Sequence, residues 1–229
     1  MNLDEEFEEF EEEFGQPTQR QEADMEALEP LREHMPGIFF SYWEKYGFST
    51  FLNGFFQFIN PLDFGPSLRL WLKGTEYEAK DDYFPFAMSF KGDLHVWGKR
   101  TGSDLSISLF QDAIIARKRN NAKGIAAGQG DKWASLALYM MPKDMDGIEG
   151  EFFSAGLKAH GALAPGEMYG LVPELPIGGE MSPTNLKKVS APEYLAMVGE
   201  LNEKPVLTTA DLARRAFGPG ADASIDKLI

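Results

Sequence analysis

The side chains best suited to catalysis in this sequence are three histidines, His34, His95 and His160, which fall in different predicted elements. None of them has a partner at the spacing that a metal site or a catalytic triad requires. The chain contains no cysteine, which excludes disulfide bonds, cysteine–zinc sites and a cysteine nucleophile. We therefore predict no catalytic residue, no metal and no cofactor, and we interpret each histidine as structural or solvent-facing.

Three polar segments resemble ligand-binding loops at first sight. Residues 144–149 (DMDGIE) begin like a calcium loop but lack its twelve-position ligand pattern. Residues 124–132 (GIAAGQGDK) are glycine-rich like a phosphate loop, but the Walker spacing is absent and Trp133 follows the lysine. We interpret these two segments as ordinary loops. Residues 117–119 (RKR) form a basic cluster that could contact phosphate or close a strand with solvated charge.

Acidic residues are concentrated at the N-terminus. The chain has a formal net charge of −14, and residues 1–33 contain 13 acidic residues against two arginines. This negative charge repels nucleic acids and membrane surfaces and attracts basic partners, although an excess of acidic residues also keeps a protein soluble. The sequence shows no signal-peptide pattern and no run of about 18 apolar residues, so we expect a cytoplasmic protein without a transmembrane helix.

This acidic segment has the pattern of a docked helix rather than of a free tail. Phe7, Phe10 and Phe14 recur at helical spacing, and glutamates fill most of the positions between them. Gly15 and Pro17 are suited to end the helix. We therefore predict a helix over residues 4–14 that packs on the body of the protein through its phenylalanine face.

The elements predicted for the rest of the chain give an α+β fold, with N-terminal helices and an antiparallel β-meander followed by a mostly helical C-terminal region. We predict a meander because the connections between successive strands are too short for the crossovers that parallel strands need. Many aromatic residues between 39 and 58 indicate core packing rather than a ligand-stacking surface. A glycine-rich loop at 122–130 suggests two domains, residues 1–121 and 122–229. The predicted helices are 24–33, 38–46, 66–73, 132–141, 150–160, 191–201 and 209–216, and the predicted strands are 55–59, 84–90, 94–98, 104–110 and 113–116.

Several segments, taken in order, resemble a known bacterial family. Residues 10–17 (FEEEFGQP), 42–48 (YWEKYGF), 55–61 (FFQFINP) and 86–98 (FAMSFKGDLHVWG) are similar to the GAD-like domain. Residues 166–171 (GEMYGL), 177–179 (IGG) and 185–189 (NLKKV) resemble the C-terminal domain that accompanies it. The motifs are aromatic and glycine positions of the scaffold, so they carry over the fold and not the contacts with a partner.

The resemblance implies an immunity protein of a type VI secretion system, which binds a DNase toxin in the cytoplasm and neutralises it. We accordingly expect no enzymatic activity, no nucleic-acid or membrane partner, and a monomer in the absence of toxin. An acidic protein is suited to occlude the basic DNA groove or the active site of a nuclease. The residues predicted to contact the toxin come from the acidic helix and two acidic loops: Glu8, Glu9, Glu12, Asp81, Asp82, Tyr83, Asp144, Asp146, Glu149 and Glu151.

Two other functions remain open from the sequence. The chain could be a protein-interaction or regulatory module without a toxin partner, which a neighbouring nuclease gene would argue against. It could also be an enzyme on a small molecule, because folding can bring together carboxylates that no motif reveals.

Overall fold

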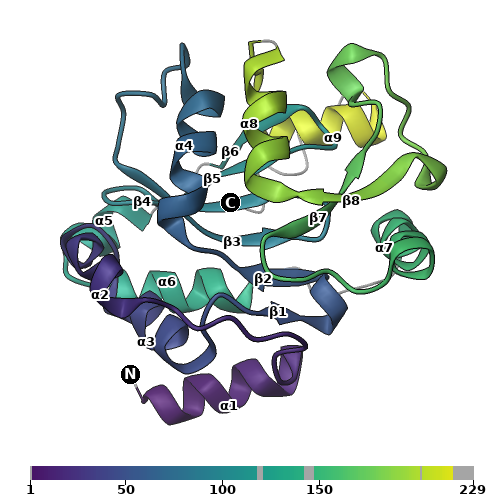
Figure 1. Ribbon diagram of the computed structural model, residues 1–229. Helices are drawn as coiled ribbons and strands as arrows, with labels where there is room; N and C mark the ends of the chain where they lie inside the picture. Colours follow the sequence, from purple (N-terminus) through teal and green to yellow (C-terminus); the bar gives the residue numbers. More distant parts are fainter. Residues whose placement is uncertain (1, 118–120, 142–146, 202, 219–229) are drawn as a thin grey trace.

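The computed structural model describes residues 2–117, 121–141, 147–201 and 203–218. Within them a seven-stranded sheet, in the order β1-β2-β3-β4-β5-β6-β9, forms the centre of the molecule, and helices cover both of its faces (Figure 1). Neighbouring strands are antiparallel except β6 and β9, which are parallel. The strands are β1 (Thr50–Phe51), β2 (Phe56–Phe58), β3 (Tyr83–Ser89), β4 (Leu94–Gly98), β5 (Gly102–Ser108), β6 (Ala113–Ala116) and β9 (Val206–Thr208).

The predicted meander corresponds to β3 through β6. Leu105 and Ile107 of β5 enter one hydrophobic core, while Ser106 between them lies on the opposite face of the sheet, as strand alternation requires. The turn between β3 and β4 depends on Gly92, which has a φ of 82° and whose Cβ position lies 2.5 Å from a Leu109 methyl group. The sequence analysis missed β9, which has three residues and pairs with β6 far along the chain.

One face of the sheet is covered by α4 (Pro61–Leu72) and α8 (Ala191–Leu201), which pack on each other (Figure 1). The indole Nε1 of Trp71 donates a hydrogen bond to the Leu195 carbonyl at 2.9 Å and links the two helices. The prediction that a helix begins at Pro66 was wrong. The Asn60 side chain accepts the Leu62 N–H at 3.0 Å and caps α4 five residues earlier, so Pro66 lies inside the helix.

The other face is covered by α1 (Leu3–Phe14), α3 (Gly37–Tyr46) and α6 (Gly130–Tyr139), next to the short α2 (Met25–Leu28) and the 3-10 turn Glu29–Glu33. Their core is largely aromatic, and all ten aromatic side chains between residues 39 and 58 are buried. The prediction of core packing for that stretch is therefore confirmed.

The glycine-rich segment 122–130 is not the flexible loop that we predicted. It contains most of α5 (Asn121–Ala126), and α6 begins at its last residue. Gly124 lies so close to the Trp133 indole that an added Cβ would be 2.0 Å from its Nε1, so the glycine permits the two helices to meet. Ala134, Ala137 and Leu138 of α6 belong to the N-terminal core. The division at residues 121 and 122 stays a prediction.

The C-terminal part contains a two-stranded hairpin as well as helices. β7 (Glu167–Leu171) and β8 (Leu186–Ser190) pair with each other, and α7 (Gly147–His160) packs against them. Two 3-10 turns, Leu175–Ile177 and Pro183–Asn185, lie in the hairpin connection. α9 (Thr209–Phe217) follows β9 and begins with a capping box between Thr208 and Asp211. Within the described ranges, no helix is long and apolar enough to cross a membrane.

Candidate partner-binding surfaces

The acidic helix α1 is fixed to the protein body by its phenylalanines. The Asn2 side chain accepts the Asp4 N–H at 3.2 Å at one end, and Gly15 closes the other end. Phe10 and Phe14 are buried, and the Phe10 ring lies 5.2 Å from the Tyr42 ring and 5.6 Å from the Phe58 ring. The predicted docked helix is confirmed, and its opposite face is held rigidly toward solvent.

The glutamates of α1 divide into two groups. Glu8, Glu9 and Glu12 are exposed, and no ion pair within the described residues involves them. Glu11 instead faces inward, where its carboxylate lies 3.0 Å from Lys45 Nζ and accepts the Tyr46 hydroxyl at 2.8 Å. These contacts hold the pKa of Glu11 below its usual range. Three of the predicted contact residues are thus available to a partner.

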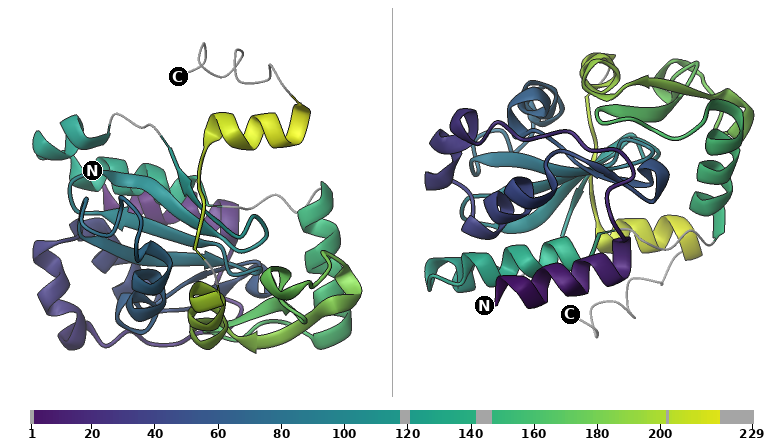
Figure 2. Two further views of the ribbon diagram at one scale, coloured as in Figure 1. Left: turned by 90° about the horizontal axis from the view of Figure 1, so that it is seen from above. Right: turned by 60° about the horizontal axis from the view of Figure 1, so that its bottom comes forward.

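Helices α1 and α6 lie side by side (Figure 2, right), and a groove runs between them. It has a volume of about 230 Å³, and the Glu6 carboxylate accepts a short hydrogen bond from the Ser135 hydroxyl across it. Its lining residues come from three helices: Glu6, Glu9, Phe10, Tyr42, Lys132, Ser135, Leu136 and Tyr139. The structure thereby adds an apolar component to the acidic surface that the sequence predicted.

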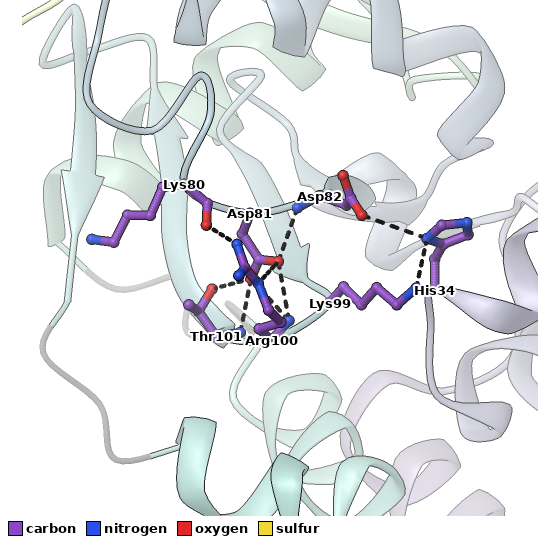
Figure 3. Close-up of polar contacts among 7 residues, drawn as sticks. All are labelled: His34, Lys80, Asp81, Asp82, Lys99, Arg100 and Thr101. Atoms are coloured by element: carbon purple, nitrogen blue, oxygen red, sulfur yellow. Dashed lines mark hydrogen bonds and ion pairs between the residues drawn. The ribbon is translucent and has the colours of Figure 1, made fainter.

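The second predicted surface, Asp81-Asp82-Tyr83, is organised differently. The Asp81 side chain is 1% exposed and accepts hydrogen bonds from the turn between β4 and β5 (Figure 3). Its oxygens accept the backbone N–H groups of Arg100 at 2.9 Å and Thr101 at 2.9 Å, and the Thr101 hydroxyl at 2.9 Å. The Arg100 guanidinium lies 3.3 Å from the same carboxylate and is itself 69% exposed. Asp81 therefore presents Arg100, rather than its own charge, to solvent.

The two residues after Asp81 point in different directions. Asp82 is 64% exposed, and its carboxylate lies 3.8 Å from His34 Nδ1, which in turn is 3.3 Å from Lys99 Nζ (Figure 3). Tyr83 is only half-exposed, and its hydroxyl oxygen is buried with no hydrogen-bond partner in the described structure. Burial raises the pKa of this hydroxyl well above its usual range, with a further contribution from the charge of Asp104. Of the three residues, Asp82 is the most accessible.

The third predicted surface is described only in part. Asp144 and Asp146 lie outside the described residues. Glu149 of α7 is 48% exposed and lies 2.6 Å from Lys91 Nζ, while Glu151 is exposed on the same helix. Lys91 is almost completely buried and also pairs with Asp93 at 2.9 Å, so Glu149 fastens α7 to the β3–β4 turn. In Figure 1, α7 lies at the opposite end of the molecule from α5.

Sequence reasoning missed Leu136 and Tyr139, which are 44% and 48% exposed in the groove. A signal for them was present. Lys132, Ser135, Leu136 and Tyr139 recur at spacings of three, one and three residues, which places them on one face of a helix. Ala134, Ala137 and Leu138 lie on another face of α6 and pack into the core, so the helix has two faces with apolar side chains instead of one.

The histidines do not meet at one site. His34 lies beside Lys99, and His160 Nε2 donates to the Leu186 carbonyl at 2.8 Å. His95 lines an open hollow of about 560 Å³ on the sheet face between α7 and α9, together with Ser106 and Arg117. In the part of the chain that the structure describes, no three histidine or acidic side chains are grouped to hold a metal ion.

Two family models match this chain, one after the other. The GAD-like domain family matches residues 5–111, and the C-terminal domain of the type VI secretion immunity protein Tdi1 matches residues 138–202. A search of curated proteins finds no match. The fold is similar to the crystal structure of Atu4351 from Agrobacterium tumefaciens, with a TM-score of 0.75 and 19% identity over 89% of this chain and 92% of that chain.

Proposed function

We propose that this chain binds and neutralises a DNase toxin. The premise is that it belongs to the type VI secretion immunity proteins that combine a GAD-like domain with a Tdi1-type C-terminal domain. The family indicates a binding protein rather than an enzyme. That the toxin is a DNase is what the family resemblance implies, and the charge of the exposed surface supports it. The means of neutralisation is inferred from the charge and geometry of that surface.

The observation that carries the proposal is the exposed acidic face of α1. Glu8, Glu9 and Glu12 project from a helix whose other face is locked into an aromatic core. A DNase must present a basic groove to DNA, and fixed carboxylates on a partner are complementary to such a groove. The same charges accelerate association by electrostatic steering, which suits a protein that must reach a toxin before the toxin reaches DNA.

We infer that neutralisation proceeds by covering the DNA groove or the active site of the toxin, in the cytoplasm and by a free monomer. The contact residues proposed are those predicted from the sequence, with Glu8, Glu9, Glu12 and Asp82 as direct contacts and with the buried Asp81 supporting the loop that carries Asp82. Glu149 and Glu151 would extend the acidic surface along α7, and Tyr83 would contact the toxin with its ring edge.

Co-expression with the nuclease domain encoded next to this gene tests the proposal. We expect cells to survive, the two proteins to co-elute as one complex, and the purified complex to leave plasmid DNA intact. The matched control is the same nuclease inactivated in its catalytic site, which should bind equally well and kill no cells. Cell death together with separate elution of the two proteins would refute the proposal. A stable complex with undiminished DNA cleavage would instead favour an interaction module of another kind.

A further inference from the structure

The groove between α1 and α6 combines features that an exposed acidic helix alone does not have. Leu136 and Tyr139 keep 44% and 48% of their surface exposed, although they stand beside a core that buries most of the neighbouring aromatic residues. The neighbouring Met140 is 56% exposed. Exposed apolar side chains that border a concave surface and are surrounded by polar residues are typical of protein-binding sites.

Two carboxylates stand on one side of this apolar surface. Glu6 is held in place by the Ser135 hydroxyl, while Glu9 is exposed one helical turn further along α1. Both carboxylates lie near the Tyr42 hydroxyl in the groove. Burial raises the pKa of Tyr42 above its usual range, and the charges of Glu6 and Glu9 raise it further. The groove thus has an apolar wall from α6 and an anionic wall from α1. Among the described residues that line it, Lys132 is the only cation.

We propose that this groove receives an arginine side chain of the toxin. The inference rests on the proposed function and names the part of the toxin that the site recognises. An arginine has an apolar stem that can pack on Leu136 and a planar guanidinium that can pair with Glu9. The groove volume of about 230 Å³ is suited to one long side chain rather than to a helix or a strand.

Other occupants fit the groove less well. A purely apolar side chain would leave the carboxylates of Glu6 and Glu9 facing hydrocarbon, which is unfavourable without a compensating partner. A second copy of this chain would bring its own charge of −14 to an acidic face, so self-association through this surface is opposed. A nuclease carries arginines on its DNA-binding surface for phosphate recognition, which makes the complementary group available.

The test fills the groove with an arginine from the immunity protein itself. In Leu136→Arg the new side chain occupies the groove, and the matched control Leu62→Arg adds the same charge at a leucine of equal exposure, 45%, on α4 across the sheet. We expect Leu136→Arg to weaken binding of the nuclease domain about 100-fold, as loss of a hot spot does. Leu62→Arg should stay within about threefold of the unmodified protein.

Each outcome is decisive once circular dichroism shows that both variants are folded. Equal weakening by the two arginines, or undiminished binding by Leu136→Arg, would overturn the arginine site while the proposed function stands. Failure of the unmodified protein to bind would refute the proposed function itself. Tyr139→Ser serves in place of Leu136→Arg if that variant does not fold, with the same expected loss.

A second pair of variants tests the charge of the occupant. Glu9 lines the groove, whereas Glu12 is also exposed on α1 but is not among the residues that line it. We expect Glu9→Gln to raise the Kd at least about fivefold more than Glu12→Gln, because only Glu9 pairs with the inserted guanidinium. Equal effects of the two variants would show that the helix acts only through its summed charge, and the arginine site would be overturned.

Discussion

Helix α1 and the Asp81 turn are both acidic segments, yet they place their carboxylates in opposite ways. On α1 the backbone N–H groups are satisfied within the helix, so nothing draws Glu8 or Glu12 inward and both stay in solvent. At the turn, the N–H groups of Arg100 and Thr101 need an acceptor, and the Asp81 carboxylate supplies it from a buried position. Donors within reach therefore decide whether an acidic residue is available to a partner: backbone N–H groups hold Asp81, and the Lys45 and Tyr46 side chains hold Glu11 on α1.

The first prediction removes the anchor of α1. In Phe10→Ala, the lost ring contacts and the remaining cavity should lower the free energy of unfolding by about 3–5 kcal/mol. The same change should weaken toxin binding, since the glutamates lose their rigid support. Chemical denaturation measures the first effect, and titration of the nuclease domain measures the second. A variant with unchanged stability would show that α1 is not docked through this face.

The second prediction removes the acceptor at the turn. Asp81→Ala leaves the backbone donors of Arg100 and Thr101 without their charged acceptor, and we expect a loss of about 2–4 kcal/mol in the free energy of unfolding. Asp82→Ala is the matched control, because its side chain is 64% exposed, and it should change stability by less than about 0.5 kcal/mol. Equal losses in the two variants would contradict the contrast between them.

The larger elements of the fold follow from local sequence patterns. The phenylalanine spacing of α1, the alternation of Leu105 and Ile107, and the aromatic stretch from residue 39 were sufficient to predict a helix, a strand and a core. The segment 122–130 was misread because glycines are more often found in loops. Here Gly124 is required by the close approach of Trp133, a tertiary contact that no local pattern shows.

The candidate site was predictable in its charge but not in its shape. Glu8, Glu9 and Glu12 were recognised from an acidic run, and their exposure agrees with that prediction. The inward position of Asp81 depends on donors 19 and 20 residues away, at Arg100 and Thr101, and so it escaped notice. Leu136 became part of the surface only because α6 packs beside α1, more than a hundred residues away in the chain.

The third prediction concerns Asp104, which is also close to the turn. Burial raises the pKa of its carboxyl group above the ordinary value of 3.8, and its Oδ1 has no hydrogen-bond partner in the described structure. A raised carboxyl pKa in the folded state contributes stability below pH 3.8, and this contribution is lost as the pH rises through the folded pKa. Asp104→Asn should therefore raise the Tm at pH 7 by about 1–3 °C, which corresponds to less than about 1 kcal/mol after solvent screening.

The pH dependence separates this explanation from a simple packing change. The gain from Asp104→Asn should disappear below pH 3.8, where the native carboxyl group is already protonated. Thermal melts of the two proteins at a series of pH values provide the comparison. A gain of equal size at every pH would argue that the charge of Asp104 has no part in the effect.

The exposed glutamates of α1 give the smallest effect on stability and the most direct test of function. We would measure the Kd of the nuclease domain for the unmodified protein and for the combined variant Glu8→Gln, Glu9→Gln, Glu12→Gln, at low and at high salt. The variant should melt within about 2 °C of the unmodified protein, because these side chains make no ion pair in the described structure. At low salt its Kd should rise about 10- to 100-fold, and the difference should shrink as salt screens the charges. An unchanged Kd at low salt would contradict the claim that the acidic face of α1 recognises the toxin.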